Sequence, residues 1–135
     1  MTGLFYAHSG LRFLVLLAGI AALLYYAYAR ATTRPIDRAS RVVGAVYSGL
    51  LDLQIVLGIL TVVTGIYYPA LIGHIVMMLM AAAAVHGSSV LARNAPDVRR
   101  YHAIRLAGVL VSLVFIAGGI MAIGRGVFTS GAPTG

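Results

Sequence analysis

Four apolar runs alternate with short polar segments along the chain. Each run is long enough to cross a bilayer as one helix. The runs cover about residues 4–29, 42–66, 70–92 and 101–123. The connecting segments are short, which favours antiparallel neighbours. The pattern therefore predicts an all-α protein, a four-helix transmembrane bundle with up-down-up-down topology.

The composition agrees with a membrane protein. Of the 135 residues, 61% are hydrophobic and 10% are charged, and the mean hydropathy is +0.97. Soluble domains carry about 25% charged residues. No cysteine is present, which excludes disulfides, thiolate metal sites and iron–sulfur clusters. We expect a single membrane domain over residues 1–135, with a retained first helix and an irregular tail at 124–135.

The arginines are distributed unevenly and predict the orientation. All ten basic residues are arginines, and the formal net charge is +7. Because they flank apolar runs, we interpret this charge as a topological signal and expect no nucleic-acid partner. Only Arg12 and Arg125 lie on the side of the termini. The positive-inside rule therefore predicts two cytoplasmic loops and both termini outside.

The first candidate site lies near the predicted outer face. His8 and His74 each lie about four residues into a helix that enters from outside, so their depths are nearly equal. Such a pair suits bis-imidazole ligation of a haem b in the bundle core. Arg12 follows His8 by one helical turn and could neutralise a propionate. Gly10 and Gly73 leave room for a macrocycle beside the two ligands.

A second candidate site lies toward the predicted cytoplasmic face. His86 and His102 could ligate a second haem there, with Arg105 three residues after His102. Their expected depths differ by roughly 6 Å at the helical rise. His74 and His86 do not share a helix face, because twelve residues rotate about 120° around an ideal helix. This spacing fits two haems with different partner helices, or one haem and an unrelated histidine.

Each histidine also has a purely structural interpretation. An intramembrane histidine often forms a hydrogen bond between helices, and this alternative stays open for His8 and His74. His86 would instead pair with Asp52, and His102 would be solvated or face the headgroups. Asp52, the only acid inside a predicted span, should face the bundle rather than lipid. We expect it to pair with His86, Arg105 or an amide donor.

Four short stretches carry a resemblance to a known family. They are YAHSGLRFLVLL at residues 6–17, QIVLG at 54–58, and GH at 73–74 with VH at 85–86. These stretches resemble small bacterial four-helix membrane proteins of the cytochrome b-like type. The resemblance implies haem b, membrane electron transfer and ligands at His8, His74 and His86, and it does not extend to His102. It also implies a multi-pass protein of the bacterial inner (cytoplasmic) membrane.

Three functions compete at this point. The first is a haem b electron-transfer protein, or a subunit of a respiratory or photosynthetic complex, relaying electrons between quinol and a partner. The second is a non-redox accessory or assembly subunit of a larger membrane complex that binds another tetrapyrrole or none. The third is a transporter around Asp52 and Gln54, which the absence of an inverted repeat disfavours.

The expected partners follow from the first two functions. They are the lipid bilayer, other membrane subunits or further copies of the chain, and a quinone. The sequence shows no nucleophile–base pair and no nucleotide-binding loop, so we expect no independent catalysis.

Overall fold

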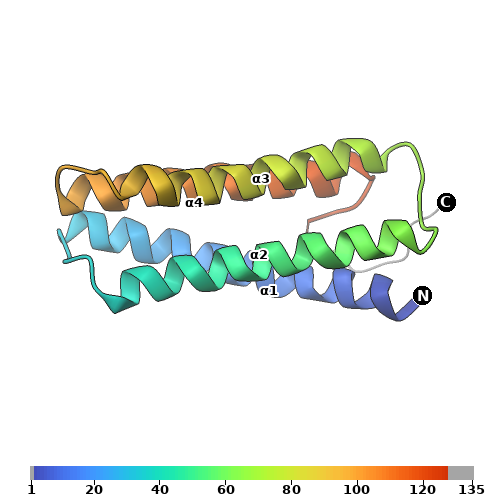
Figure 1. Ribbon diagram of the computed structural model, residues 1–135, viewed down its shortest axis with the longest axis horizontal. Helices are drawn as coiled ribbons and strands as arrows, with labels where there is room; N and C mark the ends of the chain where they lie inside the picture. The colour runs from blue at the N-terminus through green and yellow to red at the C-terminus, as the bar shows by residue number, and fades with distance from the viewer. Residues whose placement is uncertain (1, 128–135) are drawn as a thin grey trace.

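The protein is a bundle of four long helices, seen in a computed structural model that describes residues 2–127 (Figure 1). Within that range it contains no strand. The helices are α1 (Thr2–Ala31), α2 (Arg38–Val63), α3 (Leu71–Ala92) and α4 (Val98–Ala122). Each has the length and apolar composition of a membrane span. The all-α class and the four predicted spans are confirmed.

Two helices begin earlier than their apolar runs, because aspartates cap them. Asp37 accepts a hydrogen bond from the Ser40 N–H, and the Ser40 hydroxyl accepts one from the Asp37 N–H, both at 3.1 Å. This reciprocal pair satisfies two backbone donors at the start of α2. Asp97 accepts from the Arg100 N–H at 2.8 Å at the start of α4. Both helices therefore include a polar first turn outside the predicted spans.

The helices do not pack equally against one another. The α3–α4, α1–α2 and α1–α4 pairs share extensive interfaces, whereas α2 and α3 contact each other much less. The α1–α2 and α3–α4 connections lie at one end of the bundle, and the α2–α3 connection lies at the other (Figure 1). Of these four helix pairs, α2 and α3 therefore have the least extensive interface. Residues 124–127 continue beyond α4 without helix, and the rest of the predicted irregular tail lies outside the described residues.

Small residues allow the tight interfaces. A Cβ added at Gly108 of α4 would overlap the side chain of Ser88 on α3. A Cβ added at Gly19 of α1 would lie 2.6 Å from Leu113 Cδ2 and 3.0 Å from Tyr47 Cε2. Backbones can approach closely only where such side chains are missing, which is the usual basis of helix packing in membranes. Large apolar side chains instead cover much of the outer surface, as expected for lipid contact.

Candidate functional site

His8 of α1 and His74 of α3 meet in the bundle. Their ring centroids lie 6.3 Å apart, and the ring planes are almost perpendicular, at 86°. Both rings line a cavity of about 270 Å³ at the end of the bundle that holds the α2–α3 connection. The equal depth expected from the sequence therefore brings these two side chains together, although they come from different halves of the chain.

Each imidazole is oriented by a hydrogen bond from its Nδ1 atom to a backbone carbonyl. His8 Nδ1 lies 3.0 Å from the backbone carbonyl oxygen of Gln54 on α2. His74 Nδ1 lies 2.9 Å from the carbonyl oxygen of Gly119 on α4. A carbonyl oxygen can only accept, so in both rings Nδ1 carries the proton and donates it.

The Nε2 atoms are left with their lone pairs. No side chain or backbone group in residues 2–127 forms a hydrogen bond with Nε2 of His8 or His74. Metal-ligating histidines almost always donate their other ring N–H to a carbonyl or carboxylate, which fixes the tautomer and the ring orientation. Both rings therefore have the arrangement of a preformed ligand.

Groups that the sequence did not reveal support the two rings. A Cβ added at Gly58 of α2 would lie 3.0 Å from His8 Cε1. One turn earlier, the Gln54 side-chain amide donates to the His8 carbonyl oxygen at 2.8 Å, which completes a reciprocal pair between α1 and α2. The only sequence signal for this support was the i,i+4 spacing of Gln54 and Gly58, which places them on one face.

Two arginines line the otherwise apolar cavity. Arg12, predicted to lie beside His8, is in the wall and only 6% exposed. Arg125 also lines the cavity, donates from Nη1 to the Ser9 hydroxyl at 3.1 Å, and places Cζ 5.1 Å from the Phe5 ring centroid. No acidic residue is among the described residues lining this cavity. The site thus combines two imidazoles with two guanidinium groups.

The donor set fits a cofactor that brings its own additional ligands. No group of three or more His, Asp or Glu side chains among the described residues is placed to hold a metal ion. Two imidazoles alone suit an iron whose remaining ligands come from a macrocycle.

The volume of the cavity around His8 and His74 limits which cofactor it can hold without rearrangement. Pockets for small ligands and cofactors measure about 300–1,000 Å³, and this cavity is slightly smaller at about 270 Å³. A macrocycle would therefore have to widen the bundle. Separating α2 from α3 would disturb the fewest interactions, because these two helices contact each other least among the packed pairs.

The two inner histidines do not meet. His86 of α3 places Nε2 2.8 Å and 3.1 Å from the carboxylate oxygens of Asp52 on α2. The predicted pairing of Asp52 with His86 is confirmed. The prediction that Asp52 faces the bundle interior is wrong, since both side chains are 50% exposed. The pair therefore bridges α2 and α3 at the surface, between two helices that contact each other little.

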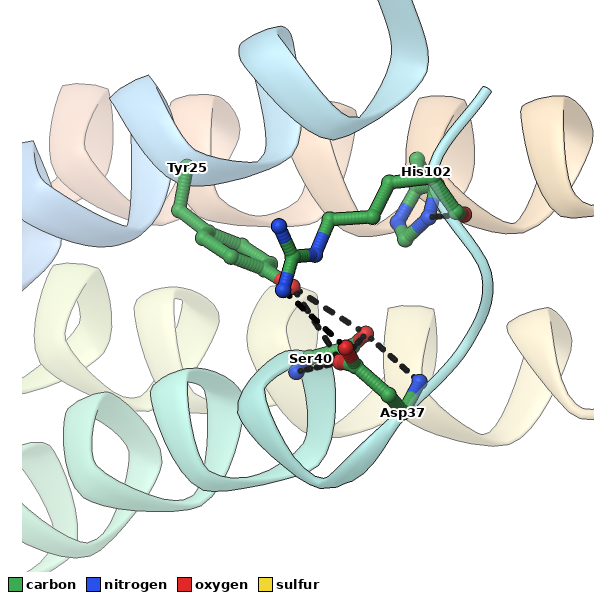
Figure 2. Close-up of polar contacts among 5 residues, drawn as sticks. Tyr25, Asp37, Ser40 and His102 are labelled. Atoms are coloured by element: carbon green, nitrogen blue, oxygen red, sulfur yellow. Dashed lines mark hydrogen bonds and ion pairs between the residues drawn. The ribbon is translucent and has the colours of Figure 1, made fainter. Parts of the chain in front are cut away.

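His102 lies at the start of α4 and is fully buried, so the solvated interpretation is wrong. Its Nε2 donates to the Arg34 carbonyl oxygen at 2.8 Å, which fixes the α1–α2 connection against α4. Figure 2 shows the ring beside this connection, and separately the Tyr25 hydroxyl pointing at the Asp37–Ser40 cap. Nε2 is thus engaged with the backbone, and His102 shares no site with His86.

Arg105, predicted to assist a second haem, is 5% exposed and turned toward neutral groups. Its Nε donates to the Tyr26 hydroxyl at 3.4 Å, and its Nη1 donates to the Val85 carbonyl at 3.3 Å. These inner side chains do not converge on one site, since His86 bonds Asp52 and His102 bonds the Arg34 carbonyl.

Comparison with known proteins adds no assignment to this geometry. No protein-family model, no curated protein and no solved structure matches the chain.

Proposed function

We propose that the chain is a haem b-binding integral membrane protein that transfers electrons, alone or as a subunit of a larger complex. The supporting observation is the His8–His74 pair, with both Nδ1 atoms tied to carbonyls and both Nε2 atoms without a partner among the described residues. We propose one haem, in the cavity between these rings. The inner histidines are not included, because His86 bonds Asp52 at the surface whereas His102 is buried beneath the α1–α2 connection.

The proposed topology is up-down-up-down with both termini outside the cytoplasm. Four spans with short connections support it, as does the crowding of arginines around the α1–α2 and α3–α4 connections. In this orientation His8 and His74 lie near the outer face. The proposed location is the bacterial inner membrane.

The chain's own residues define what such a site does. Bound there, haem b would supply a one-electron redox couple. His8 and His74 would both hold the haem iron, and two protein ligands suit electron transfer rather than oxygen binding. The carbonyls of Gln54 and Gly119 would keep both imidazoles in the ligating tautomer. Arg12 and Arg125 would offset the negative charge of the propionates, which favours the reduced haem relative to a neutral wall.

The electron donor and acceptor are proposed by chemical class. A quinol dissolved in the bilayer is a suitable donor, because the cavity lining is predominantly apolar and the bundle surface is apolar. The acceptor would be another membrane subunit or a soluble redox partner at the outer face. Neither role requires catalysis by residues of this chain.

Absorption spectroscopy with histidine variants tests the proposal. The purified protein should show a b-type spectrum that changes on reduction. His8→Ala and His74→Ala should each lower the haem-to-protein ratio several-fold. His86→Ala is the matched control on α3 and should retain full haem content, since its ring bonds Asp52. A colourless protein after expression with sufficient haem, or full haem content in both outer variants, would refute the assignment.

An accessory subunit of a membrane complex is the second candidate. The observation that favours it is the half-exposed Asp52–His86 pair, because ionisable groups on a membrane-spanning surface are costly against lipid. A partner helix covering this pair would remove that cost. Co-purification of a second membrane protein without any redox-sensitive spectrum would favour this candidate over the first.

A further inference from the structure

A second cavity lies at the opposite end of the bundle from the histidine pair. It measures about 510 Å³ and is bordered by both arginine-rich connections, through Ile36 and Ala95. Small residues of α2 and α3 form much of its wall, among them Gly44, Ser48 and Ser89. The polar lining distinguishes this cavity from the apolar one around His8.

Three arginines line this cavity, and one of them is buried. Arg41 and Arg93 are exposed at its edge, whereas Arg105 is only 5% exposed. The Arg105 guanidinium lies directly against Gly44, where a Cβ would overlap Nη2. Glycine at this position therefore lets the charged group reach the space between α2 and α4.

The buried charge of Arg105 has only neutral partners in the described residues. They are the Tyr26 hydroxyl, the Val85 carbonyl and the Ser88 hydroxyl. Nη2 forms no hydrogen bond within this part of the chain, and no described carboxylate forms an ion pair with Arg41, Arg93 or Arg105. A buried charge is normally paired, because removing it from water without a counter-ion is expensive.

We propose that this cavity binds the phosphate group of an anionic ligand, with Arg105 as the buried contact and Arg41 and Arg93 at the entrance. Guanidinium groups match phosphate oxygens in geometry and charge. The site borders the helix ends, where phospholipid headgroups lie beside a spanning bundle, and basic pockets between helices at this level bind anionic headgroups. A phospholipid headgroup and free phosphate would present the same chemistry, and the experiment separates them.

The test measures ligand binding to the purified protein in an uncharged detergent. Short-chain phosphatidylglycerol, phosphatidylcholine of equal chain length and inorganic phosphate are titrated separately, with native mass spectrometry as readout. Phosphatidylglycerol should bind best, and Arg105→Gln should weaken its binding at least about tenfold, the scale of a charge-assisted hydrogen bond. Because Arg105 is buried, the double variant Arg41→Gln/Arg93→Gln provides a second test at exposed positions.

The matched control removes two charges from the same end without touching the cavity. Arg30→Gln/Arg38→Gln changes two exposed arginines that do not line it. Retained binding in this control, with loss in the cavity variants, supports the site. If inorganic phosphate alone binds with this dependence, the site takes free phosphate. Equal loss in both double variants, or no binding of any probe to the unmodified protein, would overturn the proposal. None of these readouts depends on haem.

Discussion

His74 and Gly119 join α3 to α4 through a hydrogen bond in which Nδ1 lies 2.9 Å from the carbonyl oxygen. The same glycine also leaves space at the base of the imidazole. A Cβ added there would lie 3.5 Å from His74 Nδ1, 3.0 Å from Met77 Cβ and 2.6 Å from Met78 Cε. One residue thus supplies both the acceptor that orients the ring and the room in which the ring sits.

Gly119→Ala should therefore disturb the histidine site more than Gly118→Ala does. The methionine tip can move, but Met77 Cβ cannot without a shift of α3. We expect a loss of about 1–3 kcal/mol in stability, as for other overpacked interiors, together with lower haem content. Gly118→Ala is the control, since a Cβ there meets nothing within 4 Å. Equal haem-to-protein ratios and melting temperatures in the two variants would contradict this role of Gly119.

The Asp52–His86 pair should stabilise the α2–α3 contact. Removing either side chain leaves its partner without the 2.8 Å hydrogen bond. Hydrogen bonds between membrane helices contribute about 0.6 kcal/mol on average and up to about 1.7 kcal/mol. A double-mutant cycle with Asp52→Ala and His86→Ala, measured by reversible unfolding in detergent, should give a coupling energy in this range. A coupling near zero would mean that the pair is not formed in the membrane-like environment.

Asp37 should give the protein a dependence on acid pH. The Ser40 N–H, its hydroxyl and the Arg34 guanidinium stabilise the carboxylate against partial desolvation and lower the pKa of Asp37 from 3.8 to about 2. Since the pKa is depressed in the folded state, the stabilising contribution is complete above about pH 4 and is lost as the pH falls through about 2.

Melting temperatures of the unmodified protein and Asp37→Asn between these pH values provide the measurement. Asparagine keeps the helix cap and removes only the titrating charge. The difference in melting temperature should be largest above pH 4 and should shrink toward pH 2. A constant difference over this range would show that Asp37 does not carry the effect.

The sequence predicted the helices better than the faces that they turn inward. Apolar runs are sufficient to identify spans, and His8 and His74 were matched by depth alone. Asp52 was assigned to the interior because charge is costly in lipid, yet Leu51 next to it is the buried residue. In a helix surrounded by lipid both faces are apolar, so periodicity separates interior from exterior only weakly.

The supporting groups of the histidine pair were even less accessible to prediction. Both acceptors are backbone carbonyls, of Gln54 and Gly119, and a carbonyl is present at every residue. Arg125 was assigned to the outer side from charge counting, but its position in the cavity wall depends on how the chain turns after α4. His102 was expected near solvent because it follows two arginines, whereas the α1–α2 connection covers it.

The limited contact between α2 and α3 affects how the four helices assemble. α1 packs on α2 and α3 packs on α4, so the two halves of the chain are helical hairpins that meet mainly through α1 and α4. The first hairpin carries His8 and the second carries His74. Under the proposed function, each hairpin therefore supplies only one of the two haem ligands. A cofactor that binds only the joined halves would stabilise them by mass action. If the proposed haem is bound, the folded fraction of the protein should therefore rise with haem concentration.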